Sequence, residues 1–204
     1  MNLPNKLTVL RVILVPVFML FLCVPLGLSD TLVRVIAAVL FALTSLTDML
    51  DGKIARKYNL ITDFGKFLDP LADKFMVIGA MLVILYKAMN RETPNRLFCI
   101  LFFVAVFIVI FRELAVTSMR LVVSGSSGIV IAANWLGKIK TCTQIACVIL
   151  CFAESIFYYN IASLSFLAEW LPLSLFSTAL MAVFTLWSGI NYIKSYWQFL
   201  DPQK

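Results

Sequence analysis

The chain reads Asp48-Met49-Leu50-Asp51-Gly52-Lys53-Ile54-Ala55-Arg56 and then, after a short interval, Gly65-Lys66-Phe67-Leu68-Asp69-Pro70-Leu71-Ala72-Asp73. Four carboxylates therefore follow one another at spacings of three, eighteen and four residues. The segments on either side are long and apolar, and an acidic residue at the centre of a membrane helix costs about 2.5–3.5 kcal/mol. Four acids in such surroundings need a cationic partner, and we predict that this partner is a pair of divalent metal ions.

The composition indicates an integral membrane protein. The 204 residues are 62% hydrophobic, and the mean hydropathy is +0.97, well above that of soluble domains. A bilayer core of about 30 Å requires about 20 helical residues. We predict one domain over residues 1–204, an all-α bundle of six transmembrane helices preceded by a short N-terminal interfacial segment at Pro4 and Asn5. The helices are expected at about 7–27, 31–57, 67–88, 96–122, 135–158 and 172–199.

The distribution of charge predicts the orientation of this bundle. With six helices, both termini lie on the same side of the membrane as the acidic stretch, and so do thirteen of the seventeen Lys and Arg residues. The positive-inside rule then places the acids at the cytosolic face, in what we expect is a bacterial cytoplasmic membrane. The net charge of +6 follows from this bias and from attraction to anionic lipids, so no nucleic-acid partner is expected.

The four acids fall on helix ends that can face one another. Asp48 and Asp51 are about 60° apart around the second helix, and Asp69 and Asp73 are about 40° apart at the opening of the third. The short connecting loop predicts antiparallel neighbours, so the four carboxylates can converge on two metals about 3.5–4 Å apart. Oxygen ligands favour Mg²⁺ or Mn²⁺, and a chain without histidine offers no typical zinc site.

Small residues accompany the acids. Gly52 costs about 1 kcal/mol relative to alanine inside a helix, and with Ala55 one turn later it leaves a notch in the helix surface. Gly65 is expected at the junction between the loop and the third helix. Both places would allow a base or a phosphate to approach the backbone.

The complete pattern Asp48-x2-Asp51-Gly52-x2-Ala55-Arg56-x8-Gly65-x3-Asp69-x3-Asp73 resembles the signature of the CDP-alcohol phosphatidyltransferases. The resemblance implies a homodimer whose four aspartates bind two metals that hold the pyrophosphate of a CDP-linked lipid. Because the chain has no histidine, a carboxylate is the available general base, and the resemblance implies that it is Asp73. The CDP-lipid would contact Gly52, Ala55, Arg56, Thr62, Asp63 and Gly65.

Three further segments, residues 2–16, 111–120 and 137–141, resemble the members of this family that use glycerol 3-phosphate as acceptor. Arg112 and Arg120 are eight residues apart, an angular offset of about 80°, so both can border one cavity. Arginine binds phosphate through paired hydrogen bonds. The residues expected to bind the acceptor phosphate are Arg112, Arg120, Lys138 and Lys140.

The predicted reaction converts CDP-diacylglycerol and glycerol 3-phosphate into phosphatidylglycerophosphate and CMP. Two alternatives remain open from the sequence. The same chemistry with phosphatidylglycerol as acceptor would give cardiolipin. A divalent-cation transporter would also use intramembrane acids, but it would require polar residues to continue across the bilayer, whereas residues 35–46 and 75–86 are apolar.

Overall fold

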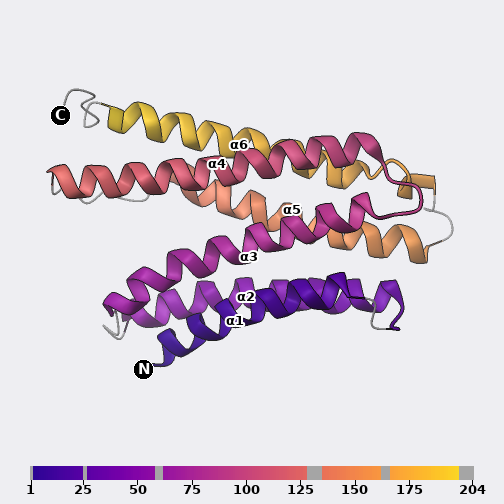
Figure 1. Ribbon diagram of the computed structural model, residues 1–204, viewed down its shortest axis with the longest axis horizontal. Coiled ribbons are helices and arrows are strands. Elements are labelled where there is room, and N and C mark those ends of the chain that lie inside the picture. Colours follow the sequence, from indigo (N-terminus) through magenta and orange to yellow (C-terminus); the bar gives the residue numbers. More distant parts are fainter. Residues whose placement is uncertain (1, 25–26, 58–61, 128–134, 162–165, 198–204) are drawn as a thin grey trace.

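The computed structural model is a bundle of long helices (Figure 1). It describes residues 2–24, 27–57, 62–127, 135–161 and 166–197, and of residues 3, 4, 48–57, 63, 66, 124–127, 159 and 160 it describes the backbone alone. Within these residues the chain forms six α-helices and no strand. Their bounds are α1 Leu3–Cys23, α2 Asp30–Lys57, α3 Asp63–Met89, α4 Arg96–Ser127, α5 Trp135–Asn160 and α6 Pro172–Tyr196.

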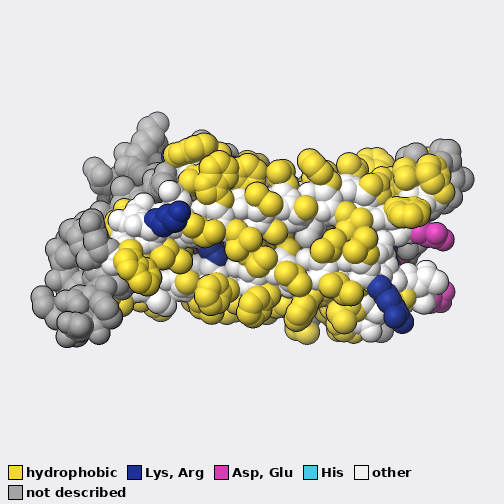
Figure 2. All heavy atoms as spheres, turned by 90° about the horizontal axis from the view of Figure 1, so that it is seen from above, with side chains coloured by type: hydrophobic (Ala, Val, Ile, Leu, Met, Phe, Trp, Pro, Cys, Tyr) yellow, Lys and Arg dark blue, Asp and Glu magenta, His cyan; other side chains and the backbone are white. Residues whose placement is uncertain are grey.

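Length and composition make five of these helices candidates to cross a membrane: α1, α2, α4, α5 and α6. The sixth, α3, has 27 residues and is about 40 Å long, which is also sufficient. Its acidic residues all precede Phe75, where its apolar part begins. Figure 2 shows a long face covered by hydrophobic side chains, with charged ones towards its ends. The predicted six-helix membrane bundle is confirmed.

Local capping explains where two helices begin earlier than predicted. In α1, Pro4 occupies the first turn, where a missing N–H costs nothing, and the helix starts at Leu3. Pro4 and Asn5, for which we predicted a short interfacial segment, thus lie in the first turns of α1, and their position at the membrane interface stays a prediction. In α3, the hydroxyl of Thr62 accepts a hydrogen bond from the backbone N–H of Gly65 and caps the helix at Asp63.

Both termini, the end of α2 and the start of α3 lie at the same end of the bundle (Figure 1). Helix α1 packs against α3 and α2, α5 packs against α2 and α6, and α4 packs against α6. Helices α2 and α3 run antiparallel, as predicted (Figure 1). Few contacts join them in the described part of the chain, where α1 lies against both, and residues 58–61 between them lie outside the described residues.

The core that holds the six helices together is apolar and fills the middle and far end of the bundle. Its fully buried side chains include Phe41 of α2, Met81 of α3, Phe102 of α4, Val148 of α5 and Met181 of α6. The polar clusters described below lie beyond this core, towards the end that carries the two termini.

Candidate active site

The two acids of α3 project from one face and are held by side chains of α1. Asp69 and Asp73 are both exposed, Asp73 to 51% of its side chain. The hydroxyl of Thr8 donates a hydrogen bond of 2.7 Å to Oδ1 of Asp69. Nη1 of Arg11 lies 3.6 Å from Oδ1 of Asp73, and the two form an ion pair.

The other half of the acidic motif lies in the last turns of α2. Asp48, Asp51, Gly52, Ala55 and Arg56 have helical backbone there, and their side chains lie outside the described residues, as does that of Asp63 in α3. Among the side chains that are described, no group of three or more His, Cys, Asp or Glu gathers. The carboxylates of Asp69 and Asp73 provide oxygen ligands of the type that Mg²⁺ and Mn²⁺ prefer.

Gly65 allows α1 to approach α3 closely. A Cβ atom at this position would lie 2.9 Å from Oδ1 of Asn5 and 3.8 Å from Oδ2 of Asp69. The amide of Asn5 also donates a hydrogen bond of 2.8 Å to the hydroxyl of Thr62. Gly65 and Thr62 thus contact α1 in the structure. From the sequence we had predicted only a contact between these two residues and the CDP-lipid.

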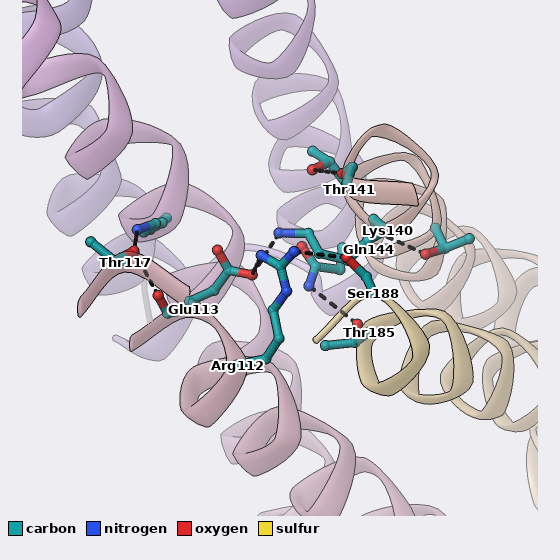
Figure 3. Close-up of polar contacts among 11 residues, drawn as sticks. Arg112, Glu113, Thr117, Lys140, Thr141, Gln144, Thr185 and Ser188 are labelled. Carbon is teal, nitrogen blue, oxygen red and sulfur yellow. Dashed lines mark hydrogen bonds and ion pairs between the residues drawn. The ribbon is translucent and has the colours of Figure 1, made fainter. Parts of the chain in front are cut away.

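A cluster of cations surrounds a single buried carboxylate between α4, α5 and α6 (Figure 3). Glu113 of α4 is 7% exposed. Its Oε1 accepts hydrogen bonds from Nζ of Lys140 at 2.6 Å and from Nη1 of Arg112 at 3.1 Å. Two cations therefore share one carboxylate oxygen in surroundings where water provides little screening.

Arg112 is oriented by α6. Its Nη2 donates a hydrogen bond of 2.7 Å to the hydroxyl of Ser188. A Cβ atom on the neighbouring Gly189 would lie 3.1 Å from Cγ of Arg112, so glycine leaves the room that the arginine stem occupies. The buried Nε of Arg112 has no hydrogen-bond partner among the described residues, which leaves one donor available to an anion.

Lys74 connects the cation cluster to the acids of α3. It follows Asp73 directly, and its Nζ donates a hydrogen bond to the hydroxyl of Thr117 on α4. That hydroxyl in turn donates to the backbone carbonyl of Glu113 at 2.7 Å. Lys74 interacts electrostatically with Asp73 on one side and with Glu113 on the other. Lys74, Arg112 and Lys140 together exceed the charge of Glu113 by two.

The two remaining residues that we predicted for the acceptor lie differently. Arg120 is exposed, and its Nε donates a 3.4 Å hydrogen bond to the hydroxyl of Tyr192 on α6. Lys138 is exposed, and within the described part of the chain no contact joins it to the cluster. The structure thus brings Arg112 and Lys140 together at Glu113, with Arg120 two turns away along α4.

The family model for CDP-alcohol phosphatidyltransferase matches residues 1–188 of this chain. The chain belongs to the CDP-alcohol phosphatidyltransferase family. The resemblance predicted from the acidic motif is therefore confirmed, and the motif lies within the matched region.

Two of three curated relatives match nearly the full length of the chain. A CDP-diacylglycerol–glycerol-3-phosphate 3-phosphatidyltransferase of Bacillus subtilis (strain 168) is 38% identical over 209 residues, 98% of this chain and 97% of the relative. A protein of the same name from Shigella flexneri serotype 5b is 33% identical over 198 residues, 95% and 94% of the two chains. A probable phosphatidylglycerophosphate synthase of Mycobacterium tuberculosis (strain H37Rv) is 41% identical over 143 residues, 70% of this chain and 62% of the relative.

Sequence reasoning missed several polar residues of this phosphatidyltransferase. Thr8 and Asn5 contact α3 from positions more than fifty residues away, so no local pattern announces the pairing. Lys74 had one available signal, because it stands next to the last aspartate of the motif. Ser188 and Thr117 look like ordinary small polar residues of membrane helices, and only the contacts with Arg112 and Lys74 distinguish them.

Proposed function

We propose that this chain transfers the phosphatidyl group of CDP-diacylglycerol to glycerol 3-phosphate, giving phosphatidylglycerophosphate and CMP. One observation carries the choice of acceptor: Lys74, Arg112 and Lys140 gather around Glu113 directly beside the acids of α3. The names of the relatives from Bacillus subtilis and Shigella flexneri support the same reaction.

The donor would be held at the acidic end. We propose that Asp48, Asp51, Asp69 and Asp73 bind two Mg²⁺ or Mn²⁺ ions. Bound there, such ions would neutralise the pyrophosphate and stabilise the negative charge that develops on the departing CMP. The CDP portion would lie near the ends of α2 and α3, against Gly52, Ala55, Arg56, Thr62, Asp63 and Gly65.

The acceptor would be held by its phosphate at the cation cluster. A phosphate monoester carries about 1.5–2 negative charges at neutral pH. Lys74, Arg112 and Lys140 exceed Glu113 by two positive charges, so the dianion would balance the cluster. The available Nε of Arg112 adds a directed donor. A neutral acceptor such as serine or inositol would leave this excess charge uncompensated. Arg120, which is exposed two turns from Arg112 along α4, would attract an anion from the cytosol.

Asp73 and Lys74 are consecutive, so the base and the phosphate site are one residue apart. We propose that the Asp73 carboxylate removes the proton from the attacking hydroxyl of glycerol 3-phosphate. The hydroxyl oxygen forms a bond to the phosphorus that carries diacylglycerol. The bond from that phosphorus to the bridging oxygen breaks, and CMP leaves with the electron pair.

Replacing the proposed base tests this chemistry. Asp73→Asn keeps the size of the side chain but removes its basicity, so we expect the loss of most CMP release while CDP-diacylglycerol binding is largely retained. General-base contributions of about 100- to 10,000-fold set the scale of the loss. Single-turnover CMP release and binding of the CDP-lipid would be measured on the same preparation. Turnover within a few-fold of the unmodified protein would exclude Asp73 as the base.

The acceptor is tested by CMP release from CDP-diacylglycerol with purified protein and Mg²⁺, with each alcohol offered separately. Release with glycerol 3-phosphate alone is the expected result. Release only with phosphatidylglycerol would make the protein a cardiolipin-forming enzyme. Release only with serine would overturn the assignment of the cation cluster to a phosphate, and release only with inositol phosphate would keep that assignment but replace glycerol 3-phosphate as the acceptor. No release, together with Mg²⁺ uptake into proteoliposomes, would favour the transporter.

We further propose that the protein is a homodimer in the bacterial cytoplasmic membrane, with its site open to the cytosol. The excess of Lys and Arg at the end that carries both termini supports this orientation. The bacterial origin of the relatives supports the location. Cysteine labelling from either side of sealed vesicles tests the orientation, and mass measurement in detergent tests the dimer.

A further inference from the structure

The first half of α1 presents a line of polar side chains to α3. Asn5, Thr8 and Arg11 are three residues apart and therefore share one helix face. Asn5 contacts Thr62, Thr8 contacts Asp69, and Arg11 contacts Asp73. Each successive residue of α1 thus meets a successive position along α3, and two of the three partners are acids of the motif.

The burial of these residues is the reverse of what simple solvation would give. Thr8 is 1% exposed and Arg11 is 2% exposed, whereas the aspartates that they contact are exposed. An exposed carboxylate is well hydrated without a protein partner, but burying an arginine is costly unless it is paired. The acids therefore do not need Thr8 and Arg11 for solvation, and the two buried residues need another explanation.

Packing alone does not require polar residues at these places. The second half of the same face is apolar, and it packs on α3 at Gly79, where a Cβ atom would lie 2.9 Å from Sδ of Met19 and 3.2 Å from Cγ1 of Val15. This half anchors α1 to α3 through close apolar contact. An apolar residue at position 8 would continue that contact, whereas the hydroxyl of Thr8 donates a hydrogen bond to Asp69.

We infer that α1 positions the acidic motif: Thr8 and Arg11 fix the orientation of the Asp69 and Asp73 carboxylates through contacts to one oxygen of each. This inference rests on the proposed function, in which both aspartates bind metal. A hydrogen bond to one oxygen of a metal-binding carboxylate orients the group and is a standard means of tuning its affinity. Both are positioning residues, because neither is proposed to touch substrate.

The test is Mn²⁺ binding to the purified full-length protein, followed by electron paramagnetic resonance of the free ion, without substrate or turnover. We expect Thr8→Val to weaken Mn²⁺ binding about 10-fold or more, since partners of metal ligands contribute about 10- to 100-fold. Thr8→Ser restores the hydroxyl and should bind Mn²⁺ like the unmodified protein. The matched control is Thr178→Val, which removes another buried hydroxyl (2% exposed) whose partners among the described residues are Ser174 of α6 and Cys147.

Three further variants, Asp69→Asn, Arg11→Met and Arg11→Lys, keep the outcomes distinguishable. Asp69→Asn should abolish most Mn²⁺ binding; if it leaves binding unchanged, the proposed metal site is wrong. If Asp69→Asn weakens binding but Thr8→Val and Arg11→Met do not, the metal site stands and the role of α1 is excluded. If Thr8→Val unfolds, Thr8→Ser and Arg11→Lys decide the matter, because a positioning role predicts near-normal binding for the first and a measurable loss for the second.

Discussion

The bundle buries one glutamate towards each end, and the two carboxylates have different partners. Glu113 of α4 meets the side chains of Lys140 and Arg112. Glu154 of α5 is 1% exposed and accepts hydrogen bonds from the backbone N–H groups of Leu173 and Ser174, at 2.8 and 2.7 Å. These N–H groups open α6, where Leu171 at φ 49° provides no side-chain cap. Glu154 thus completes a helix end and interacts with its dipole.

The charged residues near the two glutamates also differ in their partners. Near Glu154, the cations are partnered: Arg34 and Lys87 flank Asp30 at 3.4 and 4.0 Å, and Arg91 donates to Ser155 at 3.2 Å. The cavity among them is about 40 Å³, enough for one or two waters. Near Glu113, the cationic side chains of Lys140 and Arg112 share one buried carboxylate oxygen, whereas Glu154 accepts hydrogen bonds from backbone N–H groups. The comparison teaches that the partners of a buried carboxylate, and not its burial, distinguish a group that gathers cations from one that completes a helix end.

Among the variants that test this comparison, Glu113→Gln is expected to have the largest effect. The variant keeps the shape of the side chain but removes the charge that orients Lys140 and Arg112, and misplacing groups by about 1 Å can cost about 100-fold in rate. We expect kcat to fall towards this extent while the protein still binds glycerol 3-phosphate, because the cluster becomes more positive. Steady-state CMP release would measure this kcat. An unchanged kcat would show that Glu113 has no role in catalysis.

Lys140→Met should act on acceptor binding. A hydrogen bond to a charged group contributes about 1.5–3 kcal/mol, which corresponds to about a 10- to 100-fold higher KM for glycerol 3-phosphate. Lys138→Met is the matched control, because Lys138 is exposed on the same helix and should leave KM nearly unchanged. Equal effects of the two substitutions would mean that general surface charge, and not the buried cluster, attracts the acceptor.

Glu154→Gln should lower stability without affecting catalysis. The amide can still accept one backbone hydrogen bond, but the charge at the start of α6 is lost, so the free energy of unfolding should fall by about 1–2 kcal/mol. Thermal unfolding in detergent and the kinetics of the same sample would be compared. A raised KM for glycerol 3-phosphate at normal stability would contradict the structural role of this glutamate.

Gly189→Ala should give the smallest effect. The added methyl group would meet Cγ of Arg112 at 3.1 Å, so the arginine must shift by a few tenths of an ångström. We expect KM for glycerol 3-phosphate to rise a few-fold, roughly 1 kcal/mol or less. Ala at the neighbouring Ser188 is a useful comparison, because it removes the hydrogen bond to Arg112 without crowding it. If both variants behave like the unmodified protein, α6 does not orient Arg112.

The helices were predictable because long apolar runs leave no other solution in a bilayer. The contacts between the helices were harder to predict. Lys138 and Lys140 looked equivalent in sequence, but two residues correspond to about 200° of helix rotation, so only one of them can face Glu113. The pairing of Thr8 with Asp69 spans 61 residues, and the pairing of Arg11 with Asp73 joins the same two helices. Such pairings depend on how α1 packs on α3, which periodicity within either helix does not reveal.

The most direct measurement offers purified protein CDP-diacylglycerol together with excess glycerol 3-phosphate and excess phosphatidylglycerol, and identifies the lipid product by mass spectrometry. Phosphatidylglycerophosphate as the sole new lipid, formed with an equal amount of CMP, is the predicted result. Cardiolipin as the product, or no new lipid while both acceptors are present, would contradict the assignment of the cation cluster around Glu113 to an acceptor phosphate.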